Sequence, residues 1–301
     1  MRTRSAVFPF LFSILGCVGH RISAQGLVLV LALQLAVVPL RAQQNPFTQI
    51  TGNADQGIVL PQKTSLLSRQ DAGALAEIRA YRSAVSLGSW IDMQGTGELT
   101  STATDANGGS GPENATVWIL NHHGYRLDIQ KPKGTSSLRM DGAYGAVQHS
   151  NGEMKMMDAR DAVAGLLAFP ALMEASFPTN TVMLIDQGMA TVDGTVLHRI
   201  TVEKPWPGDP VDAKGDPLTT VTDLYFNPQT HLLVKSANAI YGANPSPEQL
   251  LQVITYGDYQ VVNGMQVPFQ YRETLNGQIL WTLQLHQIHL NQGLTESNFH
   301  F

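Results

Sequence analysis

Hydrophobic and polar residues recur along the chain with two different periods, one typical of helices and one typical of strands. Between Asp71 and Leu87 apolar residues return every three or four positions, which predicts an amphipathic helix. Asp71 is placed to cap this helix and Gly88 to end it. A second helix, rich in Ala and Leu, is predicted over residues 159–176, where Pro170 should kink or split it.

Most of the remaining chain alternates with a period of two, which indicates strands. The predicted strands are Trp90–Ser101, Thr116–Asn121, Tyr125–Gln130, Ser136–Met140, Gly145–His149, Thr195–Glu203, Thr219–Phe226, His231–Tyr241, Val253–Val262, Met265–Thr274 and Gln278–Leu290. They do not alternate with helices, so the sheet should be antiparallel. A sheet of this many strands has to curl in order to protect its edges.

Three Asn-Gly pairs, at residues 151–152, 263–264 and 276–277, predict tight hairpin turns. The last two pairs should join the final three strands into a meander. In the last strand Ile279, Trp281, Leu283 and Leu285 hold one face, and the apolar phase then jumps to Ile288 and Leu290. Such a switch predicts a β-bulge near His286.

The N-terminal region has the pattern of an export leader. Arg21 precedes an uncharged apolar run over residues 26–40, and Ala42 offers a small residue for cleavage, so residues 1–42 are predicted to be a signal peptide. A membrane anchor is the competing interpretation, but fifteen residues of helix span only about 22 Å of a hydrocarbon core of about 30 Å. Residues 43–70 are then a flexible lead-in, and residues 71–301 a single domain.

A leader of 42 residues is unusually long, and its first part allows two interpretations. In the first interpretation translation starts at Val18, which leaves a leader of ordinary length. In the second, residues 14–17 form a lipobox and Cys17 carries a lipid anchor. Both place the protein outside the cytoplasm, in the periplasm.

Charge and cysteine content narrow the function classes. The whole chain has a formal net charge of −5, and loss of the four leader arginines leaves 15 basic against 24 acidic side chains, a net of −9. This balance argues against nucleic acid and anionic membrane surfaces as partners. Cys17 is the only cysteine, so the mature chain has no disulfide, no thiolate nucleophile and no zinc–thiolate site.

No recognised catalytic, nucleotide-binding or metal motif occurs in the chain. His122 and His123 are adjacent and would point to opposite faces of a strand, as would His286 and His289 without a bulge. His198 lies on an apolar strand face, where a hydrogen-bonded core histidine is the simplest interpretation. We therefore expect no metal, no cofactor and no enzyme activity, although an active site built from distant residues would leave no local motif.

Several short segments together resemble the bacterial periplasmic lipoprotein carriers of the LolA/LolB-like superfamily. They are Gly124–Asp128, Ser137–Tyr144, Asp223–Pro228, Leu232–Val234, Tyr256–Pro268 and Ile288–Phe299. The resemblance implies a mainly β (α+β) fold, a half-open antiparallel β-barrel closed by two helices around an apolar cavity that takes acyl chains. One departure stands out: residues 121–122 are Asn-His where the carriers have an Arg-Pro pair whose arginine holds the lid.

Strand alternation selects candidate residues for the wall of that cavity, although an ordinary filled core would show the same pattern. These residues are Tyr125, Leu127, Ile129, Trp281, Leu283 and Leu285. Arg126 is the candidate polar contact, unless it faces outward and pairs with Asp128. The expected function is a periplasmic binding or carrier protein for a lipid or lipoprotein acyl chain, with an envelope protein as a further partner. The alternatives are an exported hydrolase with dispersed carboxylates and an envelope scaffold protein.

Overall fold

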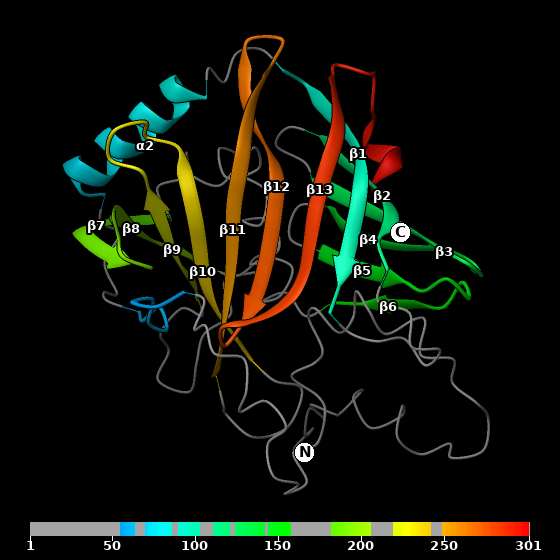
Figure 1. Ribbon diagram of the computed structural model, residues 1–301, viewed down its shortest axis with the longest axis horizontal. Helices are drawn as coiled ribbons and strands as arrows, with labels where there is room; N and C mark the ends of the chain where they lie inside the picture. Colours follow the sequence, from blue (N-terminus) through cyan, green and yellow to red (C-terminus); the bar gives the residue numbers. More distant parts are fainter. Residues whose placement is uncertain are drawn as a thin grey trace, which may run out of the picture.

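The structure is a computed structural model, and the residues that it describes are 55–63, 70–85, 90–102, 111–120, 124–141, 144–157, 182–205, 219–241 and 249–300. Within these ranges one α-helix, α2 (Ala72–Ala84), lies beside a single sheet of 13 strands (Figure 1). A short 3₁₀ helix, η5 (Glu296–Asn298), follows the last strand. The predicted leader with Cys17, His122 and His123, and the second predicted helix at 159–176 fall outside the described residues.

The strands follow one another along the chain as hairpins. Their bounds are β1 Asp92–Ser101, β2 Glu113–Leu120, β3 Gly124–Lys131, β4 Gly134–Asp141, β5 Tyr144–Gln148, β6 Met154–Met156, β7 Met183–Val192, β8 Thr195–Pro205, β9 Thr219–Phe226, β10 Leu233–Tyr241, β11 Gln249–Val262, β12 Met265–Leu275 and β13 Gln278–Leu290. All eleven predicted strands are present; β6 and β7 were not predicted.

The sheet consists of two meanders joined side by side. Its order is β6-β5-β4-β3-β2-β1-β13-β12-β11-β10-β9-β8-β7, and every pairing is antiparallel. Only the β1–β13 pair joins strands that are distant in the sequence. The edges β6 and β7 do not pair with each other, so the sheet curls without closing (Figure 1). The predicted half-open antiparallel architecture is confirmed.

Turn residues set the register of the hairpins as the sequence indicates. Asn263 and Gly264 both have positive φ, as do Asn276 and Gly277, which is the conformation of a type I′ turn. The pair Asn151-Gly152 does not have this conformation, because only Gly152 has positive φ. The Asn151 side chain instead accepts a hydrogen bond from the Glu153 N–H at 3.0 Å.

The bulge predicted near His286 is confirmed. Thr96 of β1 pairs with Gln287 and Gly97 pairs with Leu285, so His286 is left without an opposite residue. Gly97 is required at this point, since a Cβ there would lie 2.0 Å from the Gln284 carbonyl oxygen. The bulge explains how Leu285 and Ile288 both stay buried although three positions separate them.

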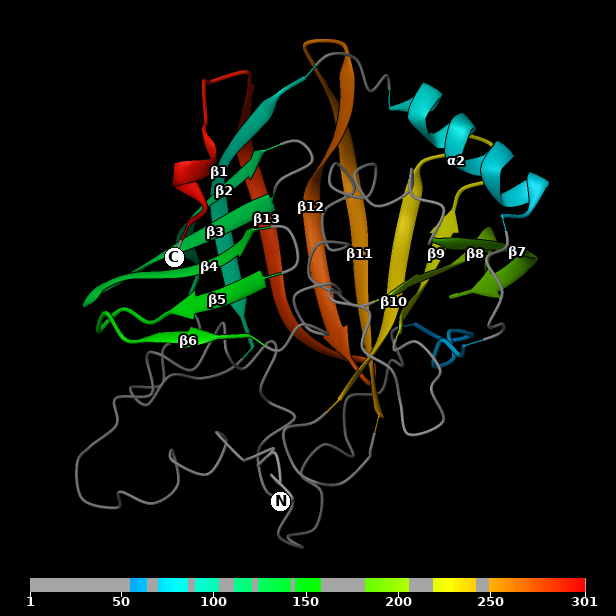
Figure 2. The ribbon, with the colours of Figure 1, turned by 180° about the vertical axis from the view of Figure 1, so that it is seen from behind.

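The curl gives the sheet an inner and an outer face, and each face has its own hydrophobic cluster. The larger cluster covers the inner face and includes Ala74, Ile78 and Tyr81 of α2. Figure 2 shows α2 on the side of the sheet that carries β7 to β9. The smaller cluster lies on the outer face of β7–β11, around Tyr225 and Val253.

Part of the stretch expected to be a flexible lead-in is packed on the outer face. Ile58 belongs to the smaller cluster, and the carboxylate of Asp55 accepts hydrogen bonds from Lys235 of β10 and Thr274 of β12. Lys235 also contacts Asp193 at 2.8 Å. The composition of this stretch suggests a loop, but a buried ion pair holds residues 55–58 in place.

Candidate functional site

The six candidate wall residues lie on the inner face and are all buried. Tyr125, Leu127 and Ile129 come from β3, and Trp281, Leu283 and Leu285 come from β13. All six belong to the larger hydrophobic cluster, with exposed fractions between 0 and 8%. Strand alternation therefore placed all six on the inner face correctly, and their role as the lining of a ligand site stays a prediction.

Ile279 does not share that wall, contrary to the expected phase of the last strand. Its side chain is 41% exposed. Glu273 of β12 pairs with Trp281 while Thr274 pairs with Ile279, so Leu280 is an additional bulged residue. This second bulge turns Ile279 to the other face, and the sequence contained no phase switch that would have predicted it.

Arg126 points away from the inner wall. Its Nε donates to Asp128 Oδ1 at 2.7 Å, and its Nη2 lies 2.7 Å from Asp128 Oδ2. The guanidinium also lies 4.4 Å from the ring centroid of Trp118, and Nη1 donates to the Asn298 carbonyl at 3.3 Å. Of the two interpretations of Arg126, the structure has the one in which it pairs with Asp128. Its bond to the Asn298 carbonyl, which also ties down the C-terminal segment, was not predicted.

A row of buried polar side chains crosses the largely apolar inner face. We call it the polar row; it consists of Thr222, Asn238, Gln252, Glu273 and Trp281, from five strands in sheet order. Thr222 pairs with Asn238, Asn238 with Gln252, and Glu273 with Trp281 in the strand register. Each of the five is at most 8% exposed.

Hydrogen bonds link neighbours within the polar row. The Thr222 hydroxyl donates to Asn238 Oδ1, and Gln252 Nε2 donates to Glu273 Oε1 at 3.0 Å. The indole N–H of Trp281 also bonds to the Glu273 carboxyl. One candidate wall residue, Trp281, thus presents its ring to the wall and its N–H to the row.

Glu273 is the ionisable group of the polar row. Burial raises the pKa of its carboxyl to about 7, and the hydrogen bonds from Gln252 and Trp281 offset only part of that shift. Burial also raises the pKa of the Tyr125 phenol, and the charge of Glu273 raises it further. Since β3 and β12 are not neighbours in the sheet, this interaction acts across the curled interior.

The sequence carries a signal for Glu273 in the alternation of β12. In β12 the residues Val267, Phe269, Tyr271 and Glu273 fall at alternate positions, so period two puts the carboxyl on the apolar face. A carboxyl on such a face is costly unless it has partners or a function. The hydrogen-bond partners of Glu273 do not follow from the sequence, because they depend on the register of β9 to β13.

A second polar cluster fastens helix α2 to the sheet; we call it the helix clasp, and it consists of Glu77, Asp186, His198 and His231. Glu77 Oε2 lies 2.8 Å from His198 Nδ1, and Glu77 Oε1 lies 2.9 Å from His231 Nδ1. The other ring nitrogen of His198 lies 2.8 Å from Asp186 Oδ1. His198 is therefore a hydrogen-bonded histidine, as expected from its strand face.

The helix clasp shifts the pKa of two of its members. Burial by itself would lower the pKa of His198, but hydrogen bonds and charge from Glu77 and Asp186 outweigh it, and the pKa is raised. Burial would raise the pKa of Asp186, but the bonds from His198 and the Gly188 N–H outweigh it, and the pKa is lowered. The clasp therefore favours a charged imidazole between two carboxylates.

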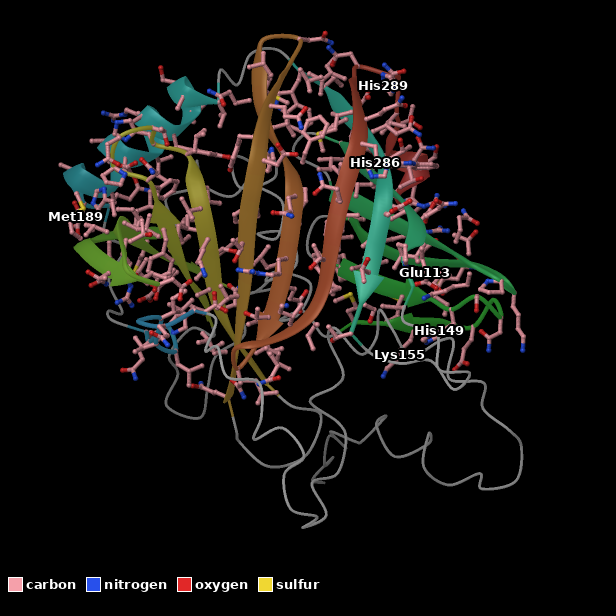
Figure 3. The ribbon with its side chains drawn as sticks, in the orientation of Figure 1. Glu113, His149, Lys155, Met189, His286 and His289 are labelled. Atoms are coloured by element: carbon pink, nitrogen blue, oxygen red, sulfur yellow. The ribbon has the colours of Figure 1, made fainter. Side chains whose placement is uncertain are left out.

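Histidine and acidic side chains are the remaining candidates for a metal site in the described part of the chain. No group of three or more His, Cys, Asp or Glu side chains there could hold a metal ion. His286 and His289 lie along β13 and are exposed (Figure 3). None of the described helices is both long enough and apolar enough to cross a membrane.

The described residues form an open, curled antiparallel sheet with a helix at its inner face, the half-open sheet that the sequence resemblance implies. No known protein-family profile and no curated protein matches the sequence. Among solved structures the chain is similar to a putative outer membrane lipoprotein-sorting protein domain from Vibrio parahaemolyticus, at 13% identity and a TM-score of 0.48, over 75% of this chain and 97% of that one.

Two further structures are similar to about the same degree. A LolA superfamily protein from Nitrosomonas europaea has 10% identity and a TM-score of 0.47, over 76% of this chain and 97% of that one. A DUF1329 family protein from Desulfovibrio piger has 10% identity and a TM-score of 0.47, over 75% of this chain and 97% of that one. The likeness is one of shape, and the nature of any ligand has to be inferred from the side chains of this chain.

Proposed function

We propose that this protein is a periplasmic binding or carrier protein that holds the acyl chain of a lipid or lipoprotein against the inner face of its sheet. The observation that carries the proposal is the inner wall itself, in which six apolar or aromatic side chains from β3 and β13 join one large cluster. The proposed leader, residues 1–42, would deliver the chain to the compartment where such ligands travel.

The energetics of this function require no covalent chemistry. Each methylene that leaves water contributes about 0.8 kcal/mol, so a dozen methylenes provide about 10 kcal/mol before the costs of association. A buried wall of aliphatic and aromatic side chains supplies the environment that such a chain needs. No catalytic residue has to be invoked, and a carrier gains from releasing its ligand unchanged.

Tryptophan quenching tests where the ligand lies, because two of the tryptophans lie on opposite faces. Trp281 is on the inner wall, whereas Trp118 lies beneath Arg126 on the outer face. Trp90 belongs to the same inner cluster as Trp281, so the test uses a Trp90→Phe background. In that background a lipid brominated on its acyl chain should quench the fluorescence of the parent and of Trp118→Phe, and should quench Trp281→Phe much less. Equal quenching of the two variants would overturn the proposed location.

The native ligand can be identified in parallel. Mature protein purified from its own host would be extracted with a mild organic solvent, and the extract analysed by mass spectrometry. A lipid recovered at one mole per mole of protein supports the proposal. An extract without lipid, together with no quenching by any brominated lipid, would refute it and favour the scaffold or hydrolase alternatives.

A further inference from the structure

The binding of an acyl chain to an apolar wall does not require the buried polar groups of the polar row. A lipid tail needs only apolar contacts, yet Gln252, Glu273 and Trp281 place an amide, a carboxyl and an indole N–H together on the inner face. Burying polar groups in a core costs free energy, and the apolar positions around them show that this sheet can be built without them.

A buried hydroxyl on the same face is a second polar group that a ligand could contact. Ser136 of β4 is 4% exposed, and its Oγ has no hydrogen-bond partner. It pairs in register with Ile129, one of the wall residues, and so shares the inner face. A ligand that accepts or donates a hydrogen bond on the inner face could satisfy this hydroxyl.

We propose that Gln252, Glu273 and Trp281 form the recognition site for the carbonyl group of the acyl ligand, as a carboxyl or an ester, while the wall holds its hydrocarbon chain. This inference rests on the proposed acyl-binding function and adds the polar end of the ligand. The second N–H of the Gln252 amide can donate to a carbonyl oxygen, and the Glu273 carboxyl can do so when it is protonated, while the Trp281 N–H holds that carboxyl in place.

The protonation state of Glu273 makes this recognition sensitive to pH. With a pKa of about 7, Glu273 is a hydrogen-bond donor below neutral pH and an anion above it. The phenols that surround it, Tyr125, Tyr256 and Tyr271, have pKa values raised by burial and do not titrate near neutral pH. Lys204 lies on β8, four strands from β12, and the burial that lowers its pKa opposes a charge there.

The experiment compares two brominated ligands of the same chain length, a fatty acid methyl ester and an alkane, by quenching of Trp281. The ester does not titrate, so any pH dependence of its binding comes from the protein. At pH 6 the wild type should bind the ester about tenfold more tightly than the alkane, the effect of one good hydrogen bond. That preference should shrink as the pH rises through 7.

Two variants of one residue separate recognition from folding. Glu273→Leu removes the donor and should abolish the preference for the ester over the alkane. Glu273→Gln keeps a neutral donor and should retain the preference without its pH dependence. An ester preference that is the same in the wild type and Glu273→Leu would overturn the inference, whereas failure of both ligands to quench the wild type would overturn the proposed function itself.

The free fatty acid of the same chain, run alongside, identifies the form of carbonyl that is recognised. If it binds more tightly than the ester and loses that advantage in Glu273→Leu, the row recognises a carboxyl. If the ester binds more tightly, the row recognises an ester. Since the helix clasp also contains a titrating group, the pH dependence must persist in His198→Gln for the assignment to Glu273 to hold.

Discussion

The carboxylate of Glu77 on helix α2 lies 2.8 Å from the imidazole of His198 on β8, and this contact joins the helix to the sheet. Glu77 is 7% exposed, so the interaction is shielded from water. The same carboxylate also contacts His231, in the connection between β9 and β10. One buried side chain therefore connects the helix to two separate parts of the sheet near its β7 edge.

The helix clasp predicts how stability depends on pH. The pKa of His198 is higher in the folded state than in the unfolded state, where it is about 6.5. The contribution of His198 to the unfolding free energy is therefore fully present below about pH 6.5 and is lost as the pH rises through the folded-state pKa. His198→Gln should lose about 2 kcal/mol of unfolding free energy at pH 6 and less at pH 8. Urea unfolding followed by circular dichroism at the two pH values measures this.

His289→Gln is the matched control, because His289 is an exposed histidine on β13. It should leave the pH dependence unchanged. Equal losses at pH 6 and pH 8 in His198→Gln would show that the ring contributes only packing. At the acidic end Asp186 acts in the opposite sense: its pKa is lowered, so its contribution is present above 3.8 and disappears as pH falls through the folded value.

Gly97 should be one of the least replaceable glycines of the sheet. A Cβ at this position would meet the Gln284 carbonyl oxygen at 2.0 Å and the Leu285 Cα at 2.7 Å, and both are backbone atoms that cannot turn aside. Gly97→Ala should therefore destabilise the protein by about 3 kcal/mol, the upper range for overpacking. Thermal unfolding measures it.

Gly111→Ala provides the comparison, since a Cβ there would meet no atom within 4 Å. Its melting temperature should stay within a few degrees of the wild type. If the two variants melt at the same temperature, the close approach of β1 and β13 at the bulge is not as tight as the structure has it.

Local sequence signals were sufficient for much of the sheet. The Asn-Gly pairs at 263–264 and 276–277 determine two hairpins on their own, and the phase switch in the last strand located the bulge at His286. β7 escaped prediction because Asp186, Gln187 and Gly188 interrupt its alternation, and the structure has a register shift there. β6 has only three residues, too few to show a period.

The polar contacts were less predictable than the apolar wall, because they join residues that are distant in the sequence. Wall residues follow from alternation within one strand, as at Tyr125, Leu127 and Ile129. The partners of Glu77 are 121 and 154 residues away, and Lys235 is 180 residues from Asp55. A carboxylate on an apolar face can be noticed in the sequence, but its partner follows only from the register of the whole sheet.

The ion pair between Lys235 and Asp55 should be essential for the packing of residues 55–58 on the outer face. Lys235 is 5% exposed and Asp55 is 5% exposed, so loss of one partner leaves the other as a buried charge. Lys235→Met should destabilise the protein by about 3–5 kcal/mol. Urea unfolding measures the loss, with Lys133→Met at an exposed position as the control.

A double variant separates the charge from the packing in this pair. Adding Asp55→Asn to Lys235→Met removes the unpaired charge, and Asn tolerates the positive φ of 69° at this position. The double variant should recover at least half of the loss. If it is no more stable than Lys235→Met alone, packing of the lysine side chain, and not its charge, accounts for the effect.

Glu273 should destabilise the folded protein at alkaline pH, as expected of a polar group kept for binding. Its pKa of about 7 lies above the ordinary value of 4.5, so its stability contribution is full below 4.5 and is lost as pH rises through about 7. Glu273→Gln should therefore raise the unfolding free energy by about 3 kcal/mol at pH 8 and by little at pH 5. Glu98→Gln, at an exposed position on β1, should change neither value. A variant that is less stable than the wild type at pH 8 would mean that the charged carboxylate is stabilised inside the curled sheet, and the cost assigned to it would be wrong.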